Sequence, residues 1–207
     1  MTDSSPSTRP SVEVRKQQIL AAAARCARRS GFHGASMADI AQAAHMSVGQ
    51  IYRYFENKEA IIAAIVDQDV QDMRERFAEL EESGVSLTEA IIAKADESLA
   101  WNYDPARAAL RLEVFAEAAR NPRVAEIVRK SDAEERAFRR DILKRTGPSG
   151  LTEAELDARG EVLSMIFEGM LIRSVNNPAS DHAAVAEALR STLRHLLADA
   201  GPAPERG

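Results

Sequence analysis

Cysteine and long apolar runs are scarce in this chain of 207 residues. Because Cys26 is the single cysteine, the chain forms no internal disulfide, and a reducing cytoplasm suits it. The best apolar run, 60–66, is far shorter than the roughly 18 residues of a membrane-spanning helix. Residues 1–11 are polar and lack the apolar stretch of a secretory signal. We expect a disordered arm there, a flexible tail over 201–207, and a cytoplasmic protein.

Residue patterns that support catalysis or metal binding are also missing from the sequence. The four histidines show no metal-ligand spacing, and one cysteine cannot build a thiolate site. No phosphate-binding loop or nucleophile elbow occurs. We therefore expect neither enzyme activity nor a cofactor. An all-helical interaction module without DNA binding stays open as an alternative class of protein.

Helical periodicity runs along nearly the whole chain, and glycine and proline fall mainly at its breaks. Strand-like alternation is rare. The pattern predicts an all-α fold of about nine helices. The expected helices span residues 12–30, 36–44, 47–55, 58–82, 86–103, 105–121, 122–145, 152–174 and 182–199.

Charge is unevenly distributed along the chain, whose net charge is −5. Residues 1–58 carry eight basic and four acidic side chains, a balance of +4, whereas the remainder carries 19 basic and 28 acidic ones, a balance of −9. A basic segment joined to an acidic body is typical of a protein in which one domain meets phosphate. Chance unevenness is the alternative interpretation of the charge pattern alone.

The first three predicted helices, one long and two short, have the layout of a helix-turn-helix. Ser36 and Asp39 predict a capping box at the start of the second helix, and Ser47 is expected to cap the third. The residue that ends the second helix in such a turn often has a positive φ, where glycine is least strained. Here it is His45, which tolerates that region better than most residues, and Met46 would pack inward.

The third helix is polar and aromatic on its outer side, as a helix that enters the major groove must be. Gln50 can pair with an adenine edge, Arg53 can reach guanine or phosphate, and Gly49 allows close approach. Tyr52 and Tyr54 can donate to phosphates. Core packing is the alternative for aromatic and apolar residues here; we expect it for Ile51 and Phe55, and Tyr54 is evenly balanced between the two.

The stretch from about 13 to 66 resembles the N-terminal domain of the tetracycline-repressor (TetR) family. Two departures stand out: His45 occupies the position of the usual turn glycine, and Ala27 that of a common phenylalanine. The features that carry the resemblance are Ile19-Leu20, Gly31-Phe32, Ile40-Ala41, Ala44, Met46-Ser47, Ile51-Tyr52, Phe55 and Asn57-Lys58-Glu59.

The resemblance implies a ligand-responsive transcriptional regulator that binds double-stranded DNA at a palindromic operator, as a homodimer and usually as a repressor. It divides the chain into a DNA-binding domain over 12–58 and a ligand-binding and dimerisation domain over 59–200. The DNA-facing residues carried over onto this sequence are Ser36, Ser47, Val48, Gly49, Gln50, Tyr52, Arg53, Tyr54 and Lys58.

The last two long helices form the dimer interface in this family. The segment around 162–172 is apolar on more than one side, so it must face both its own core and something else. A partner subunit fits that pattern, and a core helix in a monomer is the alternative. The residues expected to supply the interface are Leu163, Ile166, Phe167, Met170, Leu171, Leu189, Leu193, Leu196 and Leu197.

A pocket for a small-molecule inducer is expected between the middle helices. Its predicted lining is mostly apolar with a few polar groups, as ligand sites usually are. Plain core packing is the alternative for each residue taken singly. The candidates are Ile91, Leu99, Trp101, Asn102, Phe115, Phe138, Met165 and Arg173.

Overall fold

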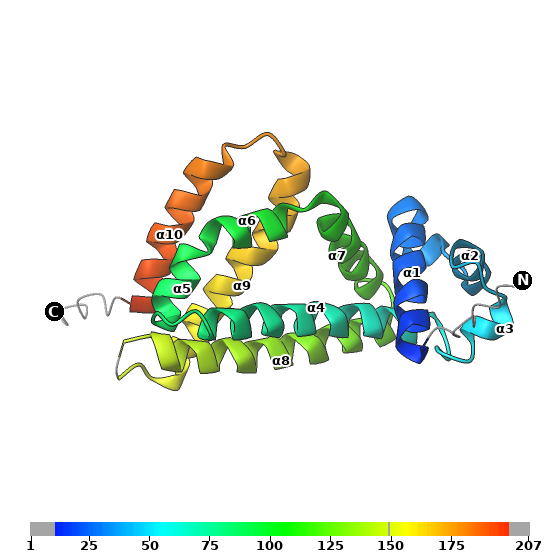
Figure 1. The fold of residues 1–207 in the computed structure, drawn as a ribbon, viewed down its shortest axis with the longest axis horizontal. Helices are drawn as coiled ribbons and strands as arrows, with labels where there is room; N and C mark the ends of the chain where they lie inside the picture. Colours follow the sequence, from blue (N-terminus) through cyan, green and yellow to red (C-terminus); the bar gives the residue numbers. More distant parts are fainter. Residues whose placement is uncertain (1–10, 149, 199–207) are drawn as a thin grey trace, which may run out of the picture.

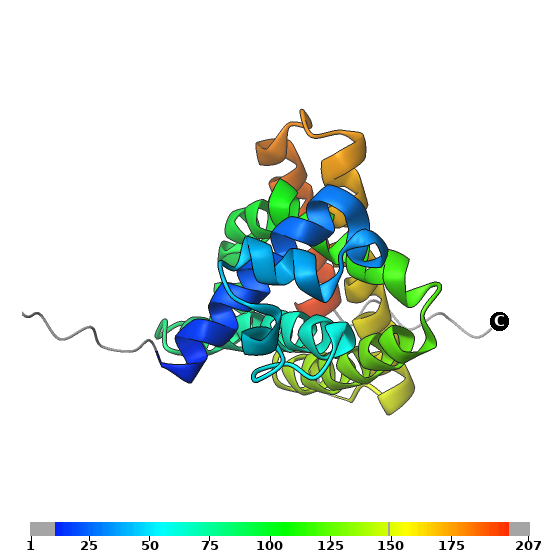
Figure 2. The same ribbon diagram turned by 90° about the vertical axis from the view of Figure 1, so that its right-hand side faces the viewer.

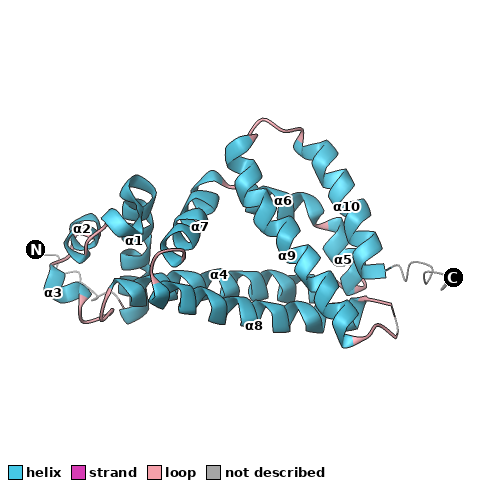
Figure 3. Ribbon diagram, turned by 180° about the vertical axis from the view of Figure 1, so that it is seen from behind, coloured by secondary structure: helices cyan, strands magenta, loops and turns pink. Residues whose placement is uncertain are grey.

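The computed structural model describes residues 11–148 and 150–198. The expected arm over 1–11 and tail over 201–207 fall outside this range, except for Ser11. Within the described residues the secondary structure consists of helices and no strand (Figure 3). The helices are α1 (Val12–Gly34), α2 (Met37–Ala43), α3 (Val48–Ile51), α4 (Lys58–Glu81), α5 (Leu87–Ala93), α6 (Ala95–Tyr103), α7 (Pro105–Ala118), α8 (Pro122–Thr146), α9 (Glu153–Asn176) and α10 (His182–Ala198).

Ten helices lie in these ranges rather than the expected nine, because the segment predicted as one helix over 86–103 is two. Lys94 leaves helical geometry, with φ −91° and ψ 16°, and it ends α5 and begins α6. Asp96 and Glu97 then occupy the first turn of α6, where carboxylates favour the start of a helix. The all-α fold class is confirmed, and the count at this point was wrong.

The helices form a triangle, and the N-terminal helices α1–α3 lie outside one of its corners (Figure 1). The long helices α4 and α8 pack side by side along one edge, and α9 crosses to meet α7, α8 and α6. At the end away from α1–α3, α10 packs on α5 and α6. Figure 2 shows α1–α3 from their own side, in front of the rest of the molecule. The N-terminal helices therefore project from the rest of the molecule while α4 remains attached to both parts.

Two apolar clusters hold the fold together. The first joins α1, α2, α3 and the N-terminal half of α4, and it includes Val114 from α7 and Val124 from α8. The second joins α6, α8, α9 and α10, with Leu99, Leu143 and Leu197 among its most buried members. Burial of each such side chain contributes about 1.5–3 kcal/mol. Because α7 and α8 enter the first cluster, the N-terminal helices are packed onto the second part of the chain.

α1 bends where the sequence places Gly31. This residue has φ 70° and ψ 160°, so helical geometry is interrupted there before one further turn through Gly34. A side chain at Gly31 would also meet Glu113 of α7, whose Oε2 lies 3.0 Å from the position of a Cβ. None of the described helices is both long and apolar enough to span a membrane.

Candidate nucleic-acid interface and ligand cavity

Both ends of α2 are capped by the hydrogen-bonded structures that its sequence predicts. The Ser36 hydroxyl accepts from the backbone N–H of Asp39, and the Asp39 carboxylate accepts from the backbone N–H of Ser36 at 2.9 Å. The Ser36 hydroxyl also donates to the Asp39 carboxylate at 2.6 Å, and this bond together with the one from the Ser36 backbone N–H holds the pKa of Asp39 below its ordinary value. At the other end His45 has φ 54°, its N–H donates to Gln42, and Met46 N–H donates to Ala41. That pair of bonds is a Schellman turn, so the positive φ predicted at His45 is confirmed.

α3 and the residues next to it present an exposed surface. The exposed residues are the N-cap Ser47, then Val48, Gly49 and Gln50 of α3, and Tyr52 and Arg53 directly after it. Ile51 is fully buried and Phe55 is 7% exposed, so both belong to the core, as expected.

Gln50 has a second role that spacing alone did not reveal. Its side-chain Oε1 accepts from the Ser47 backbone N–H at 2.8 Å, and Ser47 Oγ accepts from the Gln50 N–H at 3.2 Å. This is a capping box that holds the first turn of α3. Because Oε1 is already engaged, paired hydrogen bonds from Gln50 to adenine require the cap to open or to be shared. The Arg53 side chain makes no hydrogen bond or ion pair among those described. It is therefore more available for DNA than Gln50.

Lys58 and Tyr54 are less available than their predicted DNA contacts would suggest. The Lys58 ammonium donates to the carbonyl oxygens of Phe32, at 2.5 Å, and Ala35, at 3.1 Å. It thereby satisfies backbone acceptors where α1 ends. Tyr54 is half-buried and packs against the first apolar cluster. Both therefore have structural roles in the N-terminal domain, and their DNA contacts stay predictions.

Sequence reasoning missed two side chains that position the turn. Arg25 on α1 donates to the carbonyl of Ala43 at 2.7 Å, and Gln18 donates to that of Ala44, also at 2.7 Å. These are the otherwise open carbonyls at the end of α2. A signal was available in the sequence, since both residues lie on one face of α1 at i and i+7. They fix α2, and through it the angle at which α3 leaves the bundle.

The predicted ligand lining is not brought together as one set. Met165 is 61% exposed on α9 and Arg173 is also exposed, so neither lies in the interior of the single chain, and their ligand role stays a prediction. Ile91 and Leu99 pack in the second apolar cluster. Asn102 donates to the carbonyl of Ser98 within its own helix at 2.8 Å.

The three aromatic candidates lie in different surroundings. Phe138 stacks edge-on against Phe77, with ring centroids 5.2 Å apart. Trp101 lies against two guanidinium groups, those of Arg107 at 4.0 Å and Arg76 at 4.6 Å from its ring centroid. Phe115 does line a cavity, but one whose other walls the sequence did not identify. The ligand role of these residues stays a prediction.

That cavity has a volume of about 180 Å³ and lies between α4, α7, α8 and α9. It is more polar than expected. Arg111 and Arg129 contribute positive charge, and four carboxylates contribute negative charge. The residues around it are Val66, Asp69, Arg111, Val114, Phe115, Val128, Arg129, Ser131, Asp132, Glu135 and Glu168.

Ion pairs connect the cavity wall to the ring of Trp101. Asp69 Oδ1 lies 3.0 Å from Arg107 Nη2, and Arg107 is also 3.8 Å from Asp72. Burial raises the pKa of Asp69 above its ordinary value, although Arg107 and Arg111 act in the opposite direction. Burial likewise lowers the pKa of Arg107. These are partly desolvated charges, the condition under which a charged ligand group is recognised most strongly.

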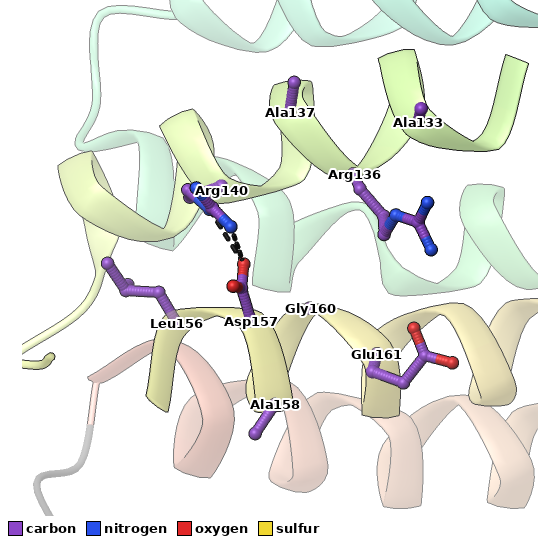
Figure 4. Close-up of a pocket in the computed structure, with 9 residues that line it drawn as sticks. All are labelled: Ala133, Arg136, Ala137, Arg140, Leu156, Asp157, Ala158, Gly160 and Glu161. Carbon is purple, nitrogen blue, oxygen red and sulfur yellow. Dashed lines mark hydrogen bonds and ion pairs between the residues drawn. The ribbon is translucent and has the colours of Figure 1, made fainter. Parts of the chain in front are cut away.

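A second, larger hollow of about 620 Å³ runs between α8 and α9 (Figure 4). It is lined by small residues such as Ala137 and Gly160, and Figure 4 shows Arg140 and Asp157 joined across it. Arg140 Nε donates to Asp157 at 2.8 Å, a pair that raises the pKa of Arg140. Arg140 and Asp157 of this hollow are therefore already paired with each other.

The outer side of α9 carries apolar residues that no described part of the chain covers. Val162, Met165, Ile172 and Val175 are between 42% and 61% exposed. The residues that the sequence suggested for an interface lie on the inner side instead: Leu163, Met170, Leu171, Leu189, Leu193 and Leu197 are buried, and Ile166, Phe167 and Leu196 pack against them. The six buried residues therefore belong to the core of the chain itself, while an interface role for Ile166, Phe167 and Leu196 stays a prediction. The inference that α9 is apolar on two sides is confirmed.

A polar α3, presented by a capped α2 and a Schellman turn at the projecting end of an all-helical chain, defines a helix-turn-helix regulator. Comparison with known proteins agrees. Residues 19–65 match the family model for bacterial regulatory proteins of the tetR family, and residues 83–199 match the model for the tetracyclin repressor-like C-terminal domain. The chain belongs to the TetR family of transcriptional regulators, which are DNA-binding proteins and not enzymes.

Relatives with known names support the same assignment. The HTH-type transcriptional regulator UidR of Escherichia coli is 35% identical over 118 residues, which cover 55% of this chain and only 57% of UidR. The HTH-type transcriptional repressor Rv1474c of Mycobacterium tuberculosis is 25% identical over 87% of this chain and 94% of its own length. The structure of Salmonella enterica GusR is similar with a TM-score of 0.72, at 28% identity, over 93% of this chain and 99% of GusR.

Proposed function

We propose that the protein is a homodimeric repressor in the cytoplasm that binds a palindromic DNA operator through α3 and releases it when a small molecule enters the C-terminal domain. The observation that carries this proposal is the outward presentation of Arg53, Tyr52 and the start of α3 from a helix-turn-helix whose turn is fixed by hydrogen bonds. Division of the chain near residue 58 into DNA-binding and ligand-binding domains is part of the proposal.

The outer side of α9 supports a dimer. Its four exposed apolar residues form a stripe at helical spacing, and an isologous contact with a second copy would cover both stripes at once. Two recognition helices related by a twofold axis can then enter major grooves about one helical turn apart, roughly 34 Å. The proposed spacing depends on this contact.

Shared side chains support coupling between the cavity and the DNA-binding end. Val114 of α7 is a buried member of the first apolar cluster, and Val66 of α4 and Val128 of α8 pack against that cluster. All three also line the cavity of about 180 Å³. A ligand that shifts these side chains must therefore repack the core on which α1–α3 stand. Allosteric coupling is typically about 1–3 kcal/mol, although a strong switch needs more.

Ligand response in a protein of this fold has a precedent in the structure of the transcriptional regulator FadR from Bacillus subtilis in complex with stearoyl-CoA, which is 20% identical with a TM-score of 0.64. At that identity only the fold is shared. The cavity of the present chain has four carboxylates around a small volume, a lining unsuited to a long acyl chain.

The DNA-binding proposal can be tested by selecting bound sequences from a random double-stranded library and measuring their affinity by gel shift. We expect an inverted repeat, and binding that weakens steeply with salt. Arg53→Ala should weaken binding about 10- to 100-fold, the range for loss of one good base contact. Arg194→Ala is the matched control, because it removes the same charge from an exposed position on α10, far from α3.

Equal losses of DNA affinity in Arg53→Ala and Arg194→Ala would show that α3 does not contact DNA. Gln50→Ala separates the two roles of that residue. If Gln50 reads a base, its loss relaxes preference at one position of the repeat; if it only caps α3, all sequences weaken alike.

A further inference from the structure

One side-chain polar group in the lining of the cavity between α4, α7, α8 and α9 has no hydrogen-bond partner among the described residues. Ser131, on α8, is 8% exposed, and its hydroxyl has no hydrogen-bond partner. A serine within a helix normally bonds to a carbonyl one turn back when it is buried. A buried hydroxyl left without a partner is destabilising, so its presence in the cavity wall points to a missing ligand atom.

Carboxylates outnumber guanidinium groups among the residues that line the same cavity, four to two. Arg107 is shared between Asp69 and Asp72, and Arg139 is shared between Asp132, at 3.6 Å, and Glu135, at 3.1 Å. Each of these two half-buried arginines thus faces two carboxylates, and Asp132 has a closer partner in Arg136, at 2.9 Å. The two arginines of the lining itself add little compensation. Arg129 is 67% exposed and pairs with Glu126 outside the cavity, and Arg111 approaches Asp69 only to 3.9 Å.

Glu168 is the carboxylate with the least compensation. It is an exposed residue of α9 at the rim of the cavity, and no cation of the described chain lies within 4 Å of its oxygens. Partial desolvation raises its pKa, and the neighbouring Asp132 and Glu135 raise it further, while Arg111 and Arg139 act in the opposite direction. The group that would relieve this arrangement is a positive charge placed inside the cavity.

We propose that this cavity binds a small organic cation, whose ammonium or amidinium group lies between Glu168 and Asp69 and donates a hydrogen bond to Ser131 Oγ. The volume of about 180 Å³ limits the ligand to a small molecule, because drug-sized ligands occupy about 300–1,000 Å³. Val66, Val114 and Phe115 provide an apolar wall for its carbon chain. The inference deepens the proposed function, since it names the ligand class of the proposed switch.

Trp101 provides a signal for binding that does not depend on DNA. It is the single tryptophan of the chain, and Arg107 lies over its ring at 4.0 Å while pairing with Asp69. A cation that competes for Asp69 shifts Arg107 and changes the emission of Trp101. Binding at the cavity is therefore read out directly by fluorescence.

The test uses three probes of matched size and different charge on the full chain: butylammonium, butanol and butyrate. We expect butylammonium, or a larger alkylammonium of the same series, to change Trp101 emission in a saturable way, with the neutral and anionic probes at least 10-fold weaker. Glu168→Gln should weaken the cation at least 10-fold, and Ser131→Ala about 3- to 10-fold. Glu161→Gln is the matched control, because Glu161 lies two turns earlier on the same helix, outside this cavity, and its substitution should leave the affinity unchanged.

Several outcomes would overturn the proposal. Tighter binding of butyrate would assign the cavity to anions held by the unpartnered Nε atoms of Arg107 and Arg139. Equal binding of all three probes would show an apolar site, and no saturable change with any alkylammonium would show that no cation enters. Equal effects of Glu168→Gln and Glu161→Gln would mean that only general charge matters.

A parallel gel shift distinguishes this proposal from the proposed function. A protein that binds the selected repeat but does not respond to alkylammonium ions fails only the cation inference. A protein that binds alkylammonium ions, with the expected effects of the substitutions, but no DNA fails only the proposed function.

Discussion

At the scale of single residues, several side chains that are predicted to contact DNA also hold the geometry of the N-terminal helices. Lys58 is the clearest case, because its ammonium donates hydrogen bonds to two backbone carbonyls at the end of α1. Gln50 is similar, because its side chain closes the first turn of α3. Loss of DNA binding in a variant of either residue is therefore not sufficient to assign a DNA contact.

For Lys58 the structural role predicts a measurable effect without DNA. Lys58→Met keeps most of the aliphatic stem and removes both hydrogen bonds, which should lower the free energy of unfolding by about 1.5–3 kcal/mol, the range for hydrogen bonds to a charged group. Urea denaturation followed by circular dichroism measures this. The same substitution at Lys130, which is exposed on α8, should change stability by less than about 0.5 kcal/mol. If both variants are equally stable, the bonds to Phe32 and Ala35 contribute nothing.

At the scale of elements, the sequence was informative where a local rule decides the structure. Ser36 with Asp39 begins a helix as predicted, and so does Ser47, because a cap depends on residues within four positions. His45 has the predicted positive φ for the same reason. Lys94 was missed because the apolar pattern continues through it and no glycine or proline marks the break.

The two faces of α9 show why the site was harder to predict than the helices. Inner residues such as Leu163 and outer ones such as Met165 are both apolar, so periodicity does not reveal which side meets the core. The cavity was missed for another reason. Its wall combines Asp69, Ser131 and Glu168 from three separate helices, and each reads in the sequence as an ordinary polar helix position.

The outer face of α9 carries the prediction for this element. Ile172→Asp should convert a dimer to a monomer while the chain stays folded, since the side chain is 52% exposed in the single chain. Burial of one isoleucine contributes about 1.5–3 kcal/mol. In a twofold interface Ile172 of both copies is replaced, so this contribution is lost twice and the dissociation constant should rise 100-fold or more. Sedimentation equilibrium measures it, with Val85→Asp, at an exposed position outside the face, as the control. An unchanged dimer would place the interface elsewhere.

At the scale of the whole molecule, the N-terminal helices stand on a core that is shared with α7 and α8. α7 contributes Val114 both to that core and to the cavity wall, and α4 runs from the helix-turn-helix along the full length of α8. Under the proposed function, we expect a change at the cavity to reach α3 through packed side chains rather than through a linker. In the proposed dimer, such a change would alter the separation of the two copies of α3.

The central claim is that two copies of the chain read two half-sites of one operator. Sedimentation velocity with a fluorescently labelled duplex tests it most directly, using the selected inverted repeat and a duplex that retains one half of it. The account predicts two chains on the full repeat and at least 100-fold weaker binding to the half-site at equal salt. One chain per duplex, bound with the same affinity to the full repeat and to the half-site, would contradict it.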